Sequence, residues 1–380
     1  MYNKLNSMLD HFLEMGVPGY DCVIMKDGKE VYHRLGGYND LENKVPMKGD
    51  ERYNIYSCSK AITCTAALQL WEKGLFQLDD LLSDYLPEFA EMTVRCEDGS
   101  VKKAENPITI RHLFTMTAGL SYKRDTEAVL CAKEASNGAI REVIRGLAKD
   151  PLYFEPGTQW LYSLCHDVLA ALVEVVSGQR FGEYVKEHIF NPLGMTRSTF
   201  LLPEEEYDTI CEQYRFDKDL GIAVNIGKQT NSYKLGALYE SGGAGGISTV
   251  SDYMKFLEAL RIGDVILKKE TVDMMETDQL NEQTRPYFWH TTHGYGLGTR
   301  APIEGVTTDF GWGSAAGMFH LVDRKNGITL FYSQHLLNSP NGTLRKRILG
   351  PIAINAVLGY EAIKVPEVDD VPAEVLSKYL

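Results

Sequence analysis

The chain has 380 residues, of which 44% are hydrophobic and 24% charged, a balance typical of a globular protein long enough for two packed lobes. Its formal net charge of −13 argues against nucleic acid as a partner, because phosphate binding requires clustered Lys and Arg. The densest basic run, residues 344–347, is expected to form the exposed face of a helix.

The sequence also argues against a membrane segment. It contains no apolar run of roughly 18 residues, and its N-terminal stretch lacks the apolar core of a secretory signal. The seven cysteines are scattered, odd in number and without a C-x-x-C pair, which favours reduced thiols over disulfides or zinc. We therefore expect a cytoplasmic protein with no membrane contact, although a chain trimmed of an export signal would look the same.

The N-terminal residues predict a helix followed by a β-hairpin. Apolar residues recur at helical spacing from Leu5 to Leu13, and Gly16 ends the pattern. Two β-rich runs, 20–25 and 30–35, then flank an Asp-Gly turn, which is a strong hairpin signal.

The middle of the chain, residues 75–240, carries mostly helical signals. Thr109 is a candidate N-cap for a helix over residues 110–114, and residues 168–176 form an apolar helical pattern that stops at Gly178. We expect a mostly helical lobe here. The glycine cluster that follows, at 242–246, does not have the spacing of a dinucleotide-binding loop.

The C-terminal part predicts a second hairpin and a closing helix. Residues 317–322 and 328–334 are β-rich, and residues 344–358 are helical in pattern. The predicted fold is therefore α+β: one antiparallel sheet built from both ends of the chain, flanked by N- and C-terminal helices, with a mostly helical lobe inserted. The expected domains are a discontinuous lobe of residues 1–74 and 241–380, and an inserted lobe of residues 75–240.

Ser57-Cys58-Ser59-Lys60 is an S-x-x-K sequence, which can activate a serine. Residues three apart share a helix face, so at the first turn of a helix the Lys amine can take the Ser proton beside the backbone N–H groups. Ser100 begins a second match in a polar stretch that reads as a turn. From these residues alone, an ordinary N-cap is the simpler interpretation of Ser57.

An ordered set of further motifs changes that interpretation. The chain resembles the serine β-lactamase-like family, which contains class C β-lactamases, DD-peptidases and family VIII carboxylesterases, from about residue 17 to residue 334. The matching stretches, in chain order, are Val17-Pro18-Gly19, Ile55-Tyr56-Ser57-Cys58-Ser59-Lys60, Ile108-Thr109-Ile110-Arg111-His112-Leu113-Phe114, Phe154-Glu155-Pro156-Gly157-Thr158, Trp160-Leu161-Tyr162-Ser163, Asn191-Pro192-Leu193-Gly194-Met195, Gly245-Gly246-Ile247-Ser248-Thr249 and Tyr295-Gly296-Leu297-Gly298.

The resemblance implies three catalytic side chains. Ser57 matches the acylated nucleophile, Lys60 its activating amine and Tyr162 the tyrosine of the second motif. Whether the amine or the phenol is the base stays open. The resemblance also implies an oxyanion hole made by the backbone N–H groups of Ser57 and Ala315.

Two departures from the lactamase pattern bear on the substrate. Leu164 stands where the second motif has Asn, so it cannot grip an acylamino carbonyl. Trp312-Gly313-Ser314 replaces the third motif, which removes the cation that would hold a β-lactam carboxylate. This combination is similar to family VIII esterases, although Ser314 departs even from their pattern. The resemblance implies that Trp312 lines the acyl or leaving-group pocket, and the alternative is an ordinary core tryptophan.

Histidines supply no clear metal site. His290 and His293 alone have ligand-like spacing, and a plain loop is the simpler interpretation. His166 and His320, beside the second and third motifs, are expected on a helix surface and on a strand.

The sequence thus predicts a serine hydrolase that needs no metal or other cofactor and acts on small-molecule esters. The alternatives are a β-lactamase or D-amino-acid peptide or amide hydrolase, and a non-catalytic penicillin-binding-type sensor. We expect the pocket walls to come from the loops at 121–150 and 278–295. Oligomeric state is left open by the sequence.

Overall fold

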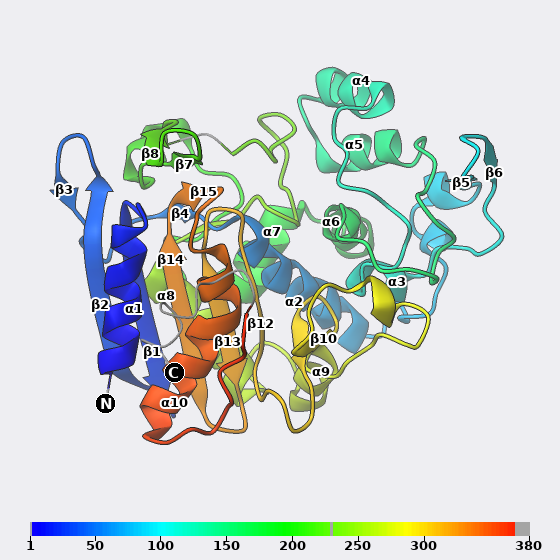
Figure 1. The fold of residues 1–380 in the computed structure, drawn as a ribbon. Coiled ribbons are helices and arrows are strands. Elements are labelled where there is room, and N and C mark those ends of the chain that lie inside the picture. Colours follow the sequence, from blue (N-terminus) through cyan, green and yellow to red (C-terminus); the bar gives the residue numbers. More distant parts are fainter. Residues whose placement is uncertain (1, 229–230, 369–380) are drawn as a thin grey trace.

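The computed structural model describes residues 2–228 and 231–368. An eight-stranded antiparallel sheet organises the molecule, in the strand order β10-β11-β12-β13-β14-β1-β2-β3 (Figure 1). Its strands, in chain order, are β1 (Gly19–Lys26), β2 (Lys29–Asp40), β3 (Val45–Pro46), β10 (His293–Tyr295), β11 (Arg300–Pro302), β12 (Phe310–Gly313), β13 (Phe319–Asp323) and β14 (Ile328–Gln334).

Both predicted hairpins are confirmed, and they lie side by side. Strand β1 pairs with β2 on one side and with β14 on the other, with Tyr20 opposite Gln334. Asp27 and Gly28 have φ values of 51° and 79°, the left-handed pair that a tight two-residue hairpin turn requires. The sheet is therefore assembled from the two ends of the chain, as the pattern predicted.

Helices cover both faces of this sheet. On one face α1 (Asn3–Glu14) and α10 (Leu349–Leu358) pack together over an apolar cluster that includes Leu330, and α8 (Val250–Ile262) packs against β13 and β14 on the other face (Figure 1). The predicted helix at 344–358 is present, but its first turn, Leu344–Ile348, is a π-helix.

The inserted part is mostly helical, as expected. Thr109 caps its first helix with a reciprocal pair of bonds to His112, and the long helix stops at Gly178, whose φ is 71°. Its helices are α3 (Ile110–Phe114), α4 (Glu127–Ser136), α5 (Ile140–Leu147), α6 (Cys165–Ser177) and α7 (Phe181–Val185). The domain boundaries at residues 75 and 240 stay a prediction.

Short strands complete the secondary structure. The small sheets are formed by β5 (Thr93–Arg95) with β6 (Val101–Lys103), β4 (Tyr53–Asn54) with β9 (Ile247–Ser248), and β7 (Tyr214–Asp217) with β8 (Ile222–Asn225) and β15 (Leu336–Leu337). The remaining helices are α2 (Ser59–Glu72) and α9 (Lys269–Met275).

Helix α2 runs through the middle of the molecule, in contact with α6, and its side chains are buried on nearly every side. This explains why its sequence shows no polar face in the first three turns. A helix end enclosed in this way is screened from bulk water, which is the setting that a reactive group at its N-terminus needs.

The basic run at 344–347 differs from the expectation of an exposed helix face. Arg345 is only 3% exposed, and its Nη1 donates a 3.1 Å hydrogen bond to the carbonyl of Met318. Lys346 remains exposed but lines a cavity. The reason is the contact of this turn with the loop after β12, which a helical pattern alone does not reveal.

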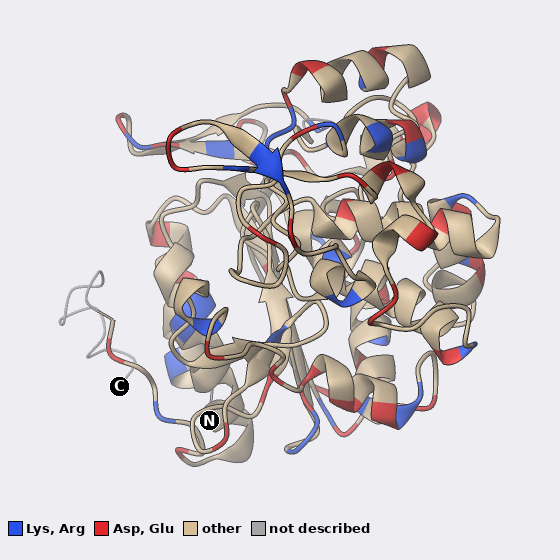
Figure 2. Ribbon diagram, turned by 90° about the vertical axis from the view of Figure 1, so that its right-hand side faces the viewer, with Lys and Arg blue, Asp and Glu red and all other residues tan. Residues whose placement is uncertain are grey.

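Acidic and basic residues are interspersed over the face formed by the helical part (Figure 2). No helix within the described ranges is long and apolar enough to cross a bilayer.

Candidate active site

Ser57 lies in a single 3₁₀ turn, Tyr56–Cys58, that leads directly into α2. The preceding strand ends at Asn54, and Tyr56, the residue just before the serine, adopts φ 44°. A left-handed conformation costs a non-glycine residue about 1 kcal/mol, so the surroundings must hold it in place. Ser59 does so, since its hydroxyl donates to the Tyr56 carbonyl at 2.5 Å and accepts from the Gly246 N–H at 2.9 Å.

Lys60 is fully buried one turn further along. Its Nζ lies 3.4 Å from Ser57 Oγ and 3.2 Å from the hydroxyl of Tyr122, and it donates to the carbonyl of Gly243 at 2.6 Å. The glycine cluster that had no assigned role therefore supplies the main acceptor for this amine.

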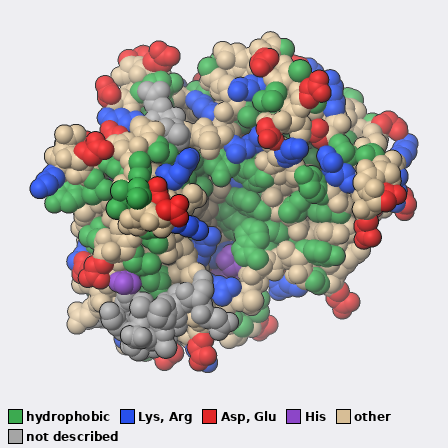
Figure 3. Space-filling view, turned by 45° about the horizontal axis from the view of Figure 1, so that its top comes forward, with side chains coloured by type: hydrophobic (Ala, Val, Ile, Leu, Met, Phe, Trp, Pro, Cys, Tyr) green, Lys and Arg blue, Asp and Glu red, His purple; other side chains and the backbone are tan. Residues whose placement is uncertain are grey.

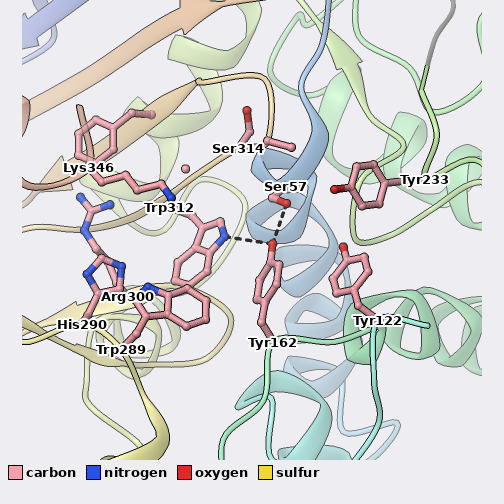
Figure 4. A pocket seen from close by; sticks show the side chains of 13 residues that line it. Ser57, Tyr122, Tyr162, Tyr233, Trp289, His290, Arg300, Trp312, Ser314 and Lys346 are labelled. Atoms are coloured by element: carbon pink, nitrogen blue, oxygen red, sulfur yellow. Dashed lines mark hydrogen bonds between the residues drawn. The ribbon is translucent and has the colours of Figure 1, made fainter. Parts of the chain in front are cut away.

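Tyr162 is the closest polar neighbour of the serine. Its hydroxyl lies 2.6 Å from Ser57 Oγ, and Trp312 Nε1 donates to the same hydroxyl at 3.4 Å (Figure 4). The Lys60 amine sits 4.6 Å from the centre of the Tyr162 ring. The structure thus brings together the three side chains that the resemblance implied, although Tyr162 is 105 residues from Ser57 in the chain.

These groups open into a cavity of about 390 Å³, whose lining includes Ser57 and the segment from Trp312 to Ala315. Among the described residues, the backbone N–H groups of Ser57 and Ala315 have no hydrogen-bond partner. Ser314, the departure from the esterase pattern, shapes the turn: its hydroxyl accepts from the Met318 N–H at 3.1 Å. The oxyanion that forms when a serine attacks a carbonyl needs hydrogen-bond donors, and two free N–H groups in the lining of the same cavity can provide them.

Leu164 is placed differently from the other predicted residues. It is 4% exposed, packs in the core at the start of α6 and does not line the cavity. An apolar side chain at this position gains more from core packing than from contact with a polar ligand. His166, expected on a helix surface, is also buried, with Nε2 3.6 Å from Cys64 Sγ. His320 lies on β13, as predicted.

Several lining residues were not identified from the sequence. Tyr122 comes from one of the two loops expected to form walls, and Trp289 and His290 come from the other. Burial raises the pKa of the Tyr122 hydroxyl well above its usual value and lowers that of His290 to about 3, so both are neutral at pH 7. Arg300 and Lys346 also line the cavity, and no motif marked them.

A buried ion pair supports this wall. Arg300 binds Asp309, and His293 Nε2 lies 3.3 Å from the same carboxylate. Burial alone would raise the pKa of Asp309, but Arg300 and His293 hold it well below its usual range. His293 thus contacts the carboxylate of Asp309. Within residues 2–228 and 231–368, no group of three or more His, Cys, Asp or Glu side chains is placed to hold a metal ion.

With this geometry established, comparison with known proteins identifies the family. The sequence model of the family described as "Beta-lactamase" matches residues 5–350. The chain belongs to the β-lactamase family. It is 30% identical over 354 residues to "Esterase EstB" of Burkholderia gladioli, a match that covers 86% of this chain and 88% of that protein. It is likewise 30% identical over 344 residues to "Lovastatin esterase" of Penicillium rubens, covering 81% and 86%.

Solved structures show the same fold. EstCE1, described as a hydrolase with promiscuous acyltransferase activity, superposes with a TM-score of 0.73 at 24% identity and covers 89% of this chain and 94% of its own. Simvastatin synthase (LovD) from Aspergillus terreus superposes with a TM-score of 0.75 at 22% identity, covering 93% and 97%. This protein is therefore a serine hydrolase of the β-lactamase fold.

Removal of the carboxylate from the buried pair should destabilise the protein. In Asp309→Asn, Arg300 keeps its charge at 3% exposure without a counter-ion, so we expect the free energy of unfolding to fall by about 3 kcal/mol. Urea denaturation followed by tryptophan fluorescence measures this loss. Asp273→Asn, which removes the half-exposed partner of Arg324, is the matched control and should cost under about 1 kcal/mol. Equal losses in the two variants would contradict the expectation.

Proposed function

We propose that this β-lactamase-fold hydrolase is an esterase that works through an acyl-enzyme on Ser57 and uses no metal or other cofactor. The observation that carries the proposal is the position of Ser57 Oγ, 2.6 Å from the Tyr162 hydroxyl and 3.4 Å from Lys60 Nζ. Both partners lie within or near the reach needed to remove a proton as the oxygen attacks a carbonyl.

Tyr162 is the better placed of the two to accept that proton. Its oxygen is closer to Ser57 Oγ than the Lys60 amine is, and the hydrogen bond that it accepts from Trp312 Nε1 holds it there. Lys60 acts beside it as a buried cation that stabilises the phenolate, since its amine lies over the Tyr162 ring and is tethered to a carbonyl.

The reaction then follows in two halves. Ser57 Oγ bonds to the carbonyl carbon while its proton passes to Tyr162, and the N–H groups of Ser57 and Ala315 bind the oxyanion. The C–O bond to the alcohol breaks as Tyr162 returns the proton to the leaving oxygen. Water then attacks the acyl carbon while the Tyr162 phenolate takes its proton. As the bond from this carbon to Ser57 Oγ breaks, Tyr162 passes that proton to Oγ, which releases the acid and regenerates the serine.

Esters are favoured over lactams and peptides because the site lacks two groups that bind those substrates in β-lactamases, the amide of the second motif and the cation of the third motif. The side chain at 164 does not reach the cavity, and Trp312 replaces the third-motif cation beside Tyr162. A β-lactam would find neither of its usual anchors there. The two relatives at 30% identity are both named as esterases, which supports the same substrate class.

The proposed esterase function does not depend on where in the cell the protein acts or on its oligomeric state. The cytoplasmic location expected from the sequence stays a prediction, as do the reduced cysteines. A solved structure of the same fold, the penicillin-binding protein homologue from Pyrococcus abyssi, is described as octameric.

A fluorophosphonate probe should label Ser57 and no other serine. Intact-mass spectrometry should show one adduct on the wild-type protein and on Ser100→Ala, because Ser100 lies in an exposed turn bonded to Asp98. Ser57→Ala should show none and should lose ester hydrolysis by about 10⁴-fold or more. Labelling of Ser57 without turnover of any ester would instead identify a sensor.

Removal of the Tyr162 hydroxyl tests the proton path. Tyr162→Phe should lower kcat by about 10²- to 10⁴-fold with little change in KM, because the ring still packs while the base is gone. Lys60→Met should have a comparable effect. Tyr153→Phe, at an exposed tyrosine, is the control and should retain wild-type kinetics. If Tyr162→Phe kept full activity and Lys60→Met had none, the lysine would be the base.

Substrate class is tested by direct comparison. We expect kcat/KM for short p-nitrophenyl esters to exceed that for nitrocefin by about 10³-fold or more, since the carboxylate of nitrocefin would be desolvated in this site without the third-motif cation. Stopped assays on both substrates with one enzyme preparation give the ratio. Efficient lactam hydrolysis without esterase activity would overturn the esterase assignment.

A further inference from the structure

The buried Lys60 ammonium has no acidic partner in the cavity that it serves. Its acceptors, the Gly243 carbonyl, the Tyr122 hydroxyl and Ser57 Oγ, carry no formal charge. None of the residues that line the cavity is Asp or Glu, and basic and histidine side chains border the hollow of the molecular surface in Figure 3. A negative charge that balances this cation must therefore come from behind the cavity wall.

Asp167, in the first turn of α6, is placed to supply that charge. The residue is fully buried, and its Oδ1 accepts hydrogen bonds from the Ser241 hydroxyl at 2.6 Å and the Tyr239 hydroxyl at 2.9 Å. Burial raises the pKa of this carboxyl group, whereas Ser241, Lys60 and Tyr239 act to lower it. The positive end of the helix also favours the ionised form. The carboxylate is thus stabilised in spite of its burial.

The second carboxylate oxygen lies beside the same glycine as the Lys60 amine. Asp167 Oδ2 is buried and has no hydrogen-bond partner among the described residues. A Cβ at Gly243 would lie 2.6 Å from Asp167 Oδ2 and 3.3 Å from Lys60 Nζ, so the two charged atoms are within about 6 Å of each other. Both residues are fully buried, so bulk water does not screen the attraction between them.

In the described part of the chain, Asp167 is the one carboxyl group among the titratable side chains around this amine. Burial raises the pKa of the Tyr122 hydroxyl well above its usual value and lowers that of His166 to about 3, so both are neutral at pH 7. Burial also raises the pKa of the neighbouring thiols, which stay protonated. The remaining titratable neighbours are these thiols, Cys58, Cys64 and Cys165, and the catalytic Tyr162.

We propose that Asp167 is a positioning residue of the active site, whose buried carboxylate keeps the Lys60 amine protonated and held at the Gly243 carbonyl. The inference rests on the proposed function, in which Lys60 acts as a cation beside Tyr162. A neutral amine could not stabilise the phenolate and would compete with it for the serine proton. The carboxylate prevents this, because loss of the Lys60 proton would leave a buried anion without its counter-charge.

The pH dependence of acylation tests this role. Asp167→Asn removes the charge, while the amide oxygen can still accept from Ser241 and Tyr239. Without the carboxylate the ammonium gives up its proton more easily, so the fall of kcat at alkaline pH should begin about one pH unit lower or more. KM should change less than about threefold. The rate of Ser57 labelling by a fluorophosphonate should show the same shift, and Asp167→Ser, which is smaller and also uncharged, should behave alike.

Asp252→Asn is the matched control. Asp252 is 3% exposed, its Oδ2 accepts from the Arg197 N–H at 2.8 Å, and it does not line the cavity. This variant should lose stability without a shift of the alkaline limb. If kcat of Asp167→Asn fell by the same factor at every pH, Asp167 would only support the fold, and the proposal would be overturned.

Urea denaturation tests the pairing without catalysis. Lys60→Met leaves a buried anion and Asp167→Asn leaves a buried cation, so both single variants should be destabilised, whereas the double variant contains neither charge. The losses should therefore not add, and the double variant should unfold at a urea concentration no lower than that of the less stable single variant. Additive losses would show that the two side chains do not interact.

The outcomes separate the two proposals. If no ester is hydrolysed and the probe does not label Ser57, the esterase function falls, while the urea measurements still decide whether Asp167 and Lys60 are paired. If the wild-type protein is an esterase labelled at Ser57 but Asp167→Asn keeps its alkaline limb, the esterase function stands and the role of Asp167 is wrong.

Discussion

The enclosure of the Lys60 ammonium is the constraint on which the site depends. A fully buried cation needs an acceptor, and the backbone of the glycine cluster provides it at 2.6 Å. That approach requires glycine: a Cβ at Gly243 would lie 2.6 Å from Asp167 Oδ2 and 3.3 Å from Lys60 Nζ. The same loop fixes the hydroxyl of Ser59 and, through it, the strained turn at Tyr56. One buried charge thus connects α2, the glycine loop and the backbone that presents Ser57.

The sheet positions the opposite side of the reacting centre. Strand β12 ends at Gly313, next to the turn that carries Ser57, and the loop after it presents the Ala315 N–H. Strand β12 is paired with β13 along its whole length, and β13 with β14, so the Ala315 N–H, one of the two proposed oxyanion donors, follows directly on a rigid part of the sheet. The helical part contributes Tyr162 and Tyr122. The site therefore lies where three segments that are far apart in the sequence meet: the turn before α2, the loop after β12 and the helical part.

The charge of the molecule is distributed unevenly. The whole chain has 52 acidic and 39 basic residues, yet the lining of the active-site cavity holds Arg300 and Lys346 and no carboxylate. The aromatic wall between those cations and the serine, built from Trp312, Trp289 and Phe319, lowers the local dielectric. A low dielectric strengthens the interaction of the Tyr162 phenol with the Lys60 amine. Packing and charge thus act together in the same cavity.

The sequence by itself determined the features that depend on neighbours in the chain. The Asp27-Gly28 turn needs left-handed residues, Thr109 and Gly178 are local helix signals, and Ser57 with Lys60 shares a helix face at a spacing of three. The tertiary structure alone decided which distant side chains line the cavity. No local sequence pattern identifies Tyr122 or Lys346 as cavity-lining residues. Leu164 is buried in the core and does not line the cavity, and Arg345 of the basic run at 344–347 is buried as well. The reason is physical: hairpins and caps are set by φ, ψ and hydrogen bonds within a few residues, whereas a cavity is the space left when remote segments pack together.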